Sequence, residues 1–303
     1  MILDPVDAFK KTSLLPTPTA TPSPTPLPTI VPTPPIFEKI AGEGIRTLWV
    51  TFAIMLLCTI IFVFLSWRVP VQKRLFHVLV TFMSVLATIS YFAMATGDGS
   101  TYIHSRHTVY HKHTGGVTKE HIFRQVFWAH YVQWALTTPI LILNLAFLAG
   151  LNGASIIVAV FSNLSMVLLG LFSAYTRRSA PKWGYFTMAI IAYIFILYQF
   201  VLPARRAVLA RDNVTTKIYA SLGVFAFILW TLYPILWALG DGAGRWDVDT
   251  GVIAFAVLDI LAVPVFGFWL ILKHAGRDVA TVDGFWSNGL SSEGGIRIGD
   301  SDA

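Results

Sequence analysis

A single carboxylate, Asp259, lies near the start of the apolar run that extends from Val257 to Gly267. Burying an ionisable group in an apolar segment is costly, and such a group usually marks an ion, counter-ion or ligand site. Val263 stands four residues later, one helical turn along the same face. The chemistry of this run therefore depends on Asp259, on Val263 and on the side chains that other segments bring to them.

Two further apolar segments carry groups that suit a buried site. One contains His130, Gln133 and Asn144, and the other repeats large aromatic side chains at helical spacing. The members of this aromatic stripe are Trp230, Tyr233 and Trp237. Ordinary core packing explains such a stripe when it stands alone. In combination with Asp259 and a proline-containing third span, it needs a more specific explanation.

The elements that position these residues follow from composition. The chain has 303 residues, of which 55% are apolar and only 13% charged, whereas about a quarter of the residues of a soluble domain are charged. This indicates a membrane protein. The net charge of +6 is scattered between apolar runs and forms no basic stripe for nucleic acid. The one cysteine, Cys58, provides no disulfide or metal framework.

Seven apolar segments are each long enough to cross a hydrocarbon core about 30 Å thick. They are expected at residues 47–67, 75–96, 123–149, 154–176, 183–203, 216–240 and 250–273. Because each run is continuously apolar, helices are the form expected to span the membrane. The prediction is an all-α membrane protein, a bundle of seven transmembrane helices over residues 47–273.

The two ends differ from this domain. Nine prolines lie between Pro16 and Pro35, so residues 1–46 are expected to form a disordered tail, or alternatively an O-glycosylated stalk. Lysine and arginine are divided almost evenly between the two sets of loops, which leaves only a marginal bias. We expect the N-terminus outside, residues 274–303 as a cytoplasmic tail, and a location in the plasma membrane.

The connection from residue 97 to 121 alternates β-branched residues before a glycine pair, which predicts a short β-hairpin between the second and third spans. Three of its histidines, His107, His111 and His113, would share one strand face and form a weak candidate site for a transition metal. The alternative is a solvated polar cap whose histidines titrate near neutral pH. We favour the cap and expect no metal.

Several motifs together resemble those of the microbial rhodopsins, and most closely of their fungal branch. The third span contains Tyr131-x-x-Trp134-x-x-Thr137-Thr138-Pro139, and the sixth contains Trp230-x-x-Tyr233-Pro234-x-x-Trp237. Val257-Leu258-Asp259 with Ala262 is similar to the seventh-helix signature, and Tyr91 matches a tyrosine of the second helix. The resemblance covers residues from about 46 to 300.

This resemblance implies a retinal pocket and a lysine four residues after the seventh-helix aspartate, which forms a Schiff base with retinal. The implied pocket wall consists of Tyr91, Trp134, Thr137, Thr138, Pro139, Trp183, Trp230, Tyr233, Pro234 and Trp237. Val263 occupies the lysine position and has no amine. The remaining lysines lie in tails, loops or span ends, so no covalent cofactor is expected.

The resemblance also implies the relay positions of the proton-pumping members of the family. There the third helix carries an acceptor aspartate, a donor aspartate and an arginine, and this chain has Gln133, Asn144 and His130 at those positions. An amide cannot exchange a proton at physiological pH. Light-driven pumping is therefore not expected. With its cation missing, Asp259 is expected to be protonated or to depend on hydrogen bonds from Tyr91, Tyr233 or an ionised His130.

The function expected from this resemblance is that of a retinal-free opsin-related protein that is not an enzyme. The lysine-less proteins that it resembles are associated with stress response and with regulation of the plasma-membrane proton pump, which implies a regulatory or chaperone-like role and a partner such as a proton ATPase. An alternative is a receptor or carrier that binds retinal or a lipid noncovalently, and a weaker one is a passive ion pathway. A homodimer or homotrimer is also an expectation.

Overall fold

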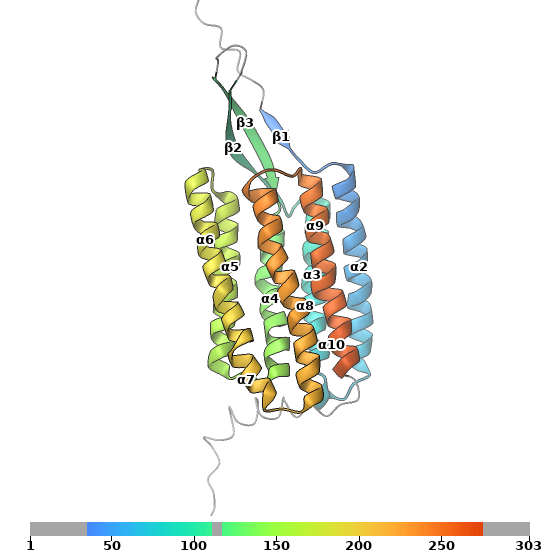
Figure 1. Ribbon diagram of the computed structural model, residues 1–303. Coiled ribbons are helices and arrows are strands. Elements are labelled where there is room, and N and C mark those ends of the chain that lie inside the picture. Colours follow the sequence, from blue (N-terminus) through green and yellow to red (C-terminus); the bar gives the residue numbers. More distant parts are fainter. Residues whose placement is uncertain (1–34, 111–116, 275–303) are drawn as a thin grey trace, which may run out of the picture. The chain divides into compact units, whose positions relative to one another are not determined.

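The computed structural model describes residues 35–110 and 117–274, and gives the backbone alone for residues 72, 105–110, 117–120 and 274. Within these ranges, seven helical segments are long and apolar enough to cross a membrane. They stand side by side as a bundle (Figure 1). The predicted seven-helix architecture is confirmed.

The helices follow the predicted apolar runs closely. Their bounds are α2 Gly42–Trp67, α3 Leu75–Thr96, α4 Trp128–Ala149, α5 Gly153–Tyr175, α6 Ser179–Val201, α8 Asn213–Trp237, α9 Val248–Ile260 and α10 Phe266–His274. A short α7, Pro203–Leu209, extends the fifth span, and a π-helical turn, Ala238–Gly242, ends the sixth. The seventh span is the most enclosed, since 61% of its most apolar stretch is buried, against 22% for α2. It is therefore the element that positions buried chemistry.

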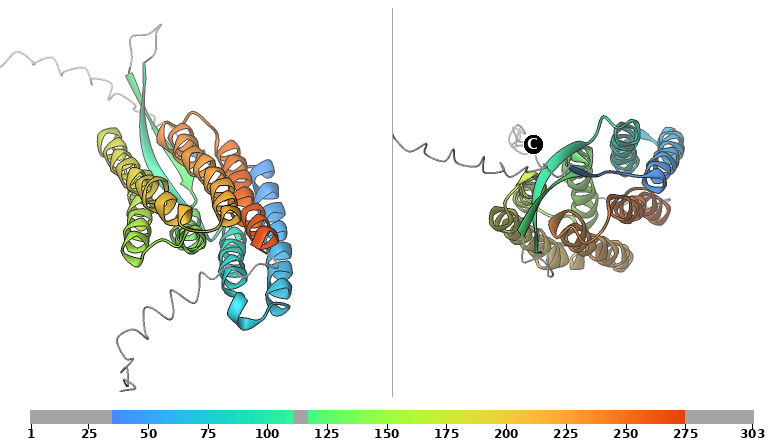
Figure 2. Two further views of the ribbon diagram at one scale, coloured as in Figure 1. Left: turned by 60° about the horizontal axis from the view of Figure 1, so that its bottom comes forward. Right: turned by 90° about the horizontal axis from the view of Figure 1, so that it is seen from above.

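The predicted hairpin is present and is longer than expected. Strand β2, Thr101–Tyr110, pairs antiparallel with β3, Val117–Val126, and β1, Ile36–Glu38, pairs parallel with β3 in the order β1-β3-β2. The sheet extends beyond the end of the bundle at which α2 and α9 begin (Figure 1). Viewed along the bundle, it lies over the helix ends (Figure 2).

This sheet corrects two predicted boundaries. The third span starts at Trp128 and not at 123, because residues up to Val126 pair with β2 instead of continuing the helix. Likewise residue 46 is not the end of a tail, since β1 pairs with β3 and α2 starts at Gly42. Pairing between segments distant in sequence overrode the local composition in both places. Residues 1–34 and 275–303, where the rest of the expected tails lie, are outside the described ranges.

The seventh span changes its helical geometry at Pro264. Proline has no N–H to donate to the carbonyl of Ile260, so the regular ladder of hydrogen bonds cannot continue there. Residues Leu261–Val265 form a π-helical turn between α9 and α10. The irregularity at Pro264 thus takes the form of a wider turn, a type of irregularity often found at functional sites.

Beyond this turn, α10 packs closely on α2 and α3. A Cβ added at Gly267 would lie 2.5 Å from Val80 Cγ1 and 3.0 Å from the Phe62 ring. Neighbouring side chains such as Phe266 are fully buried in the same cluster. Gly267 therefore permits an approach that sets the position of the preceding turn.

We expect Gly267→Ala to lower the free energy of unfolding by about 1–3 kcal/mol, because the added methyl group overpacks this contact. Gly223→Ala in α8 is the matched control, since its Cβ would meet only the Tyr219 ring at 4.0 Å. The control is expected to be neutral or to stabilise by up to about 1 kcal/mol through helix propensity. Thermal unfolding of the detergent-purified proteins, followed by circular dichroism, measures both. Equal stability of the two variants would contradict the close packing of α10.

Candidate functional site

Asp259, close to the end of α9, is the centre of a buried cluster of hydrogen bonds. Its carboxyl group is almost fully enclosed, with 1% of the residue exposed. Oδ1 accepts from Tyr233 Oη at 2.5 Å and from Trp134 Nε1 at 3.1 Å. Oδ2 accepts from Tyr91 Oη at 2.7 Å and from Gln133 Nε2 at 3.0 Å. Four donors from α3, α4 and α8 thus satisfy one carboxyl group.

His130 stands at the edge of this cluster. Its Nε2 lies 3.3 Å from Asp259 Oδ2 and 3.3 Å from Tyr91 Oη. The imidazole is parallel to the Trp134 ring, with centroids 5.1 Å apart and planes 8° apart. Since the Asp259 carboxylate is within reach, protonated His130 would be its cation. The three residues expected to satisfy Asp259, namely Tyr91, Tyr233 and His130, all lie against it.

Gln133 and Asn144 occupy different environments. Gln133 belongs to the Asp259 cluster, whereas its Oε1 has no hydrogen-bond partner in the part of the chain that is described. Asn144, three turns further along α4, is fully buried and donates to the Ile140 carbonyl and to Met83 Sδ. Eleven residues of helix separate the two amides by about 16 Å. Among the described residues, no continuous chain of hydrogen bonds connects Asn144 to Asp259.

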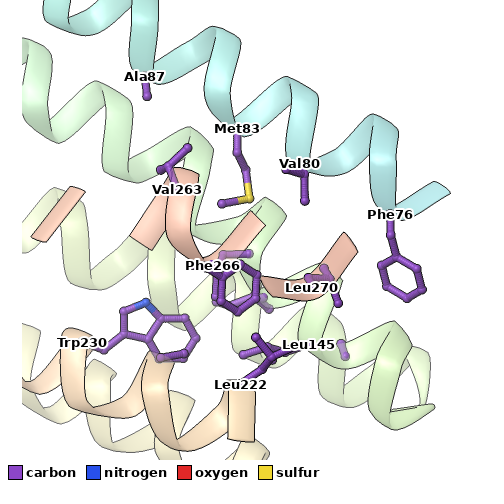
Figure 3. Packing of buried hydrophobic residues seen from close by; sticks show 14 of the residues in the cluster. Phe76, Val80, Met83, Ala87, Leu145, Leu222, Trp230, Val263, Phe266 and Leu270 are labelled. Atoms are coloured by element: carbon purple, nitrogen blue, oxygen red, sulfur yellow. The ribbon is translucent and has the colours of Figure 1, made fainter. Parts of the chain in front are cut away.

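Val263 faces the core one turn after Asp259, within the π-helical segment. It is 3% exposed and belongs to the main hydrophobic cluster. Figure 3 shows it beside Met83 of α3, on the span that also carries Phe266 and Leu270. The cavity next to Asp259 is lined by Met83, Trp134, Thr137, Thr138, Leu141, Trp230, Tyr233, Asp259, Ala262 and Val263. Since none of these is a lysine, the residues at this site do not fit a Schiff base with retinal.

Three small cavities surround the aromatic side chains of α4 and α8. The one at Val263 has a volume of about 20 Å³, which is room for about one water molecule. The second, of about 80 Å³, lies among α4, α5, α6 and α8, and the third, of about 60 Å³, lies between them. All three share Trp134 and Tyr233 in their walls. The three cavities therefore meet at these two side chains.

Seven of the ten residues expected in the wall of the retinal pocket line one or more of these cavities. The side chains that line at least one of these cavities are Trp134, Thr137, Thr138, Trp230, Tyr233, Pro234 and Trp237. Tyr91 bonds to Asp259 instead, and Pro139 is not in any of the three walls. Trp183 departs from the prediction, because it is 37% exposed at the start of α6. Phe186, one turn later, stacks on Trp237 and lines the 80 Å³ cavity where Trp183 was expected.

Sequence reasoning missed the side of the wall formed by α5 and α6. Met166, Val167 and Gly170 of α5 line the 80 Å³ cavity, as do Phe186 and Ala189 of α6. Apolar residues on these spans suit lipid, core and pocket equally well, so their type alone carried no signal.

A second polar cluster, also missed, closes the sheet end of the bundle. Arg124 Nη1 donates to Glu38 Oε2 and to the Trp246 carbonyl, each at 2.9 Å, and Nε lies 3.5 Å from Asp241 Oδ1. Tyr131 Oη is 3.5 Å from Asp241 Oδ2. A cavity of about 20 Å³ separates this cluster from His130. The charges of Arg124, Glu38 and Asp241 could not be paired from sequence because β1 was not predicted.

The metal candidate of the hairpin stays a prediction. His111 and His113 lie outside the described residues, and only the backbone of His107 is described. Among the side chains that the structure does describe, no group of three or more metal-binding residues is present.

We expect Tyr91→Phe to lower the free energy of unfolding by about 1.5–3 kcal/mol, because a hydrogen bond to the enclosed carboxyl group is lost. Tyr193→Phe is the control, since it removes a hydroxyl–hydroxyl bond to Thr231 of the same length, 2.7 Å. That bond is worth about 0.5–1.5 kcal/mol. Unfolding of both proteins in a denaturing detergent measures the difference. A control that is the less stable of the two would contradict the central role of Asp259.

Comparison with known proteins places this geometry in a family. Residues 45–276 match the family model described as bacteriorhodopsin-like protein. The chain is 46% identical to Opsin-1 of Neurospora crassa over 276 residues, which cover 90% of each protein. It is 29% identical to archaerhodopsin-2 of Halobacterium sp. over 79% of this chain and 89% of that protein.

A solved structure agrees with these sequence relatives. The light-driven proton pump of Leptosphaeria maculans is 44% identical and superimposes with a TM-score of 0.77, covering 80% of this chain and 98% of that one. The sequence motifs, the seven-helix bundle and the length of the matches thus all point to the same family. The chain belongs to the microbial rhodopsin family, in its fungal branch, and is an integral membrane protein.

Proposed function

We propose that this protein is an opsin-related membrane protein that holds no covalent retinal, does not pump protons in response to light, and has a regulatory or chaperone-like role. The observation that carries the proposal is Val263, which is packed in the core one turn after Asp259. A Schiff base needs an amine at this position. Valine supplies only methyl groups.

The Asp259 cluster supports the same conclusion. Its carboxyl oxygens already receive hydrogen bonds from four protein side chains, and His130 is the nearest basic group. This arrangement stabilises Asp259 without a cofactor cation. The amide of Gln133, which is bonded to it, neither accepts nor releases a proton near neutral pH. Both features favour a structural role for the cluster over proton transfer.

The pump of Leptosphaeria maculans shares the fold, and its activity is light-driven proton transport. Such activity needs a bound group that absorbs light. At Val263 this chain offers no amine to hold one, and Asn144 has no acidic proton to donate. We therefore propose that the fold is retained and the pumping chemistry is not.

The regulatory or chaperone-like part of the proposal rests on the resemblance to lysine-less opsin-related proteins. Its partner would be another membrane protein such as a proton ATPase, and the protein would act by contact and not as an enzyme. We further propose a plasma-membrane location with the N-terminus outside.

The absence of covalent retinal is tested by adding all-trans retinal to the purified protein and to Val263→Lys. The unchanged protein is expected to form no band above about 450 nm that survives washing, and no retinyl adduct after borohydride reduction, because it lacks the amine. Val263→Lys supplies that amine next to Asp259 and is expected to form the adduct. Absorbance and mass spectrometry measure both.

A borohydride-stable adduct on the unchanged protein would overturn the proposal. Val263→Lys combined with Pro264→Ala controls for the proline beside the new lysine. If neither variant forms an adduct, the space around Val263 is closed to retinal, and the unchanged protein is retinal-free for that additional reason.

A second candidate function is noncovalent binding of retinal or another apolar chain. The 80 Å³ cavity favours it, because its wall is almost wholly apolar and includes Phe186, Trp237 and Met166. A long ligand would have to move Trp134 or Tyr233, since these separate the three cavities. The smaller volume at Val263 would then join the same space.

If the cavity binds such ligands, Gly170→Leu should weaken retinal binding about tenfold, because the new side chain enters the cavity. Gly184→Leu is the control, since it is exposed and a Cβ there meets nothing within 4 Å. Quenching of tryptophan fluorescence by added retinal measures both affinities. Equal affinities in the two variants would remove this cavity from consideration.

A further inference from the structure

Two histidines of the sheet meet that were not part of the predicted metal set. His104 of β2 and His121 of β3 are 17 residues apart, and His104 Nε2 lies 2.8 Å from His121 Nδ1. Their ring centroids are 5.0 Å apart and their planes differ by 12°. Because the nitrogens are much closer than the centroids, the rings meet edge to edge and nearly in one plane.

A hydrogen bond between two imidazoles requires one bare nitrogen that accepts and one N–H that donates. The bare nitrogen is the form that binds transition metals. If the donating ring moves its proton to its other nitrogen, both facing nitrogens present lone pairs. If one ring then turns so that its lone pair no longer points along the line between the nitrogens, an ion can bind to both nitrogens with no net release of protons.

The two facing nitrogens are already adjacent, at the length of a hydrogen bond, so a turn of one ring brings both lone pairs onto a common ion. Metal–nitrogen bonds of about 2.0 Å place two ligand nitrogens of one ion about 2.8–3.3 Å apart, which is close to this separation. We propose that His104 and His121 form a two-histidine site for a divalent transition-metal ion, with Cu²⁺ bound more tightly than Ni²⁺ or Zn²⁺.

The sheet holds the two rings in place. In the antiparallel register His104 is opposite Phe123, and His121 is opposite Arg106, so the histidines are diagonal neighbours on one face. The Phe123 ring lies 4.8 Å from the His104 ring and 5.2 Å from that of Phe37. This row of rings fixes His104. His121 is exposed, so its ring can turn to aim its lone pair at an ion, and water can fill the remaining ligand positions.

The site is tested on the full-length protein, without a polyhistidine tag, in lipid nanodiscs titrated with Cu²⁺. We expect an electron paramagnetic resonance spectrum with splitting from two nitrogens. His121→Phe keeps the ring and removes the ligand, so it should raise the dissociation constant at least about tenfold, because the two-point attachment is lost. His104→Phe should do the same.

His111→Phe and His113→Phe are the matched controls, because they remove histidines of the same connection and leave the pair intact. Both are expected to retain the affinity and the two-nitrogen spectrum. An unchanged affinity in His121→Phe, or a loss in either control equal to that in His121→Phe, would overturn the proposal in favour of the loop histidines or of unspecific binding. Tighter binding of Zn²⁺ than of Cu²⁺ would contradict the proposed order of affinities. His121→Gln repeats the test if the phenylalanine variant changes the circular dichroism spectrum.

Discussion

The burial of one carboxyl group imposes the strongest constraint on this bundle. Removing a carboxylate from water costs several kcal/mol unless polar partners replace the water. Asp259 obtains those partners from three other helices, through Tyr91 of α3, Gln133 and Trp134 of α4, and Tyr233 of α8. The same bonds that stabilise Asp259 therefore fix the relative positions of α3, α4, α8 and α9.

This constraint explains how a site without covalent retinal, as we propose, can persist. In a protein with a Schiff base, the cation would help to stabilise the aspartate. Here Val263 has no amine to form such a cation, whereas four side chains donate to Asp259 and His130 lies 3.3 Å away. The aromatic side chains around Asp259 likewise serve two purposes, because Trp134 and Tyr233 both donate to the carboxyl group and separate the apolar cavities. Opening a path for a ligand would thus disturb the hydrogen bonds that hold the site together.

The sheet end of the molecule is held together by strand pairing and ion pairs instead of by a buried carboxyl group. Its strands pair segments that are far apart in sequence, and Arg124 of β3 joins Glu38 of β1 to Asp241 at the end of the sixth span. The wall of one small cavity includes Arg124 and Asp241 of this cluster as well as His130, which contacts Asp259. The polar contacts at the sheet and those in the bundle are therefore neighbours, although Arg124 and His130 share no hydrogen bond within the described residues.

The sequence by itself determined the seven spans, the hairpin, the family and the polar positions at Asp259, His130 and Gln133, because apolar length and motif spacing are local properties. The absence of an amine at position 263 was also evident from the sequence, because it can be read from the type of that one residue. Tertiary structure alone decided which side chains reach Asp259, why Phe186 and not Trp183 forms the wall, and that β1 and the pair His104–His121 exist. These depend on contacts between distant segments. For the pocket wall there is a further reason. In a membrane, core-facing and lipid-facing residues are equally apolar, so residue type could not reveal which of them form the wall.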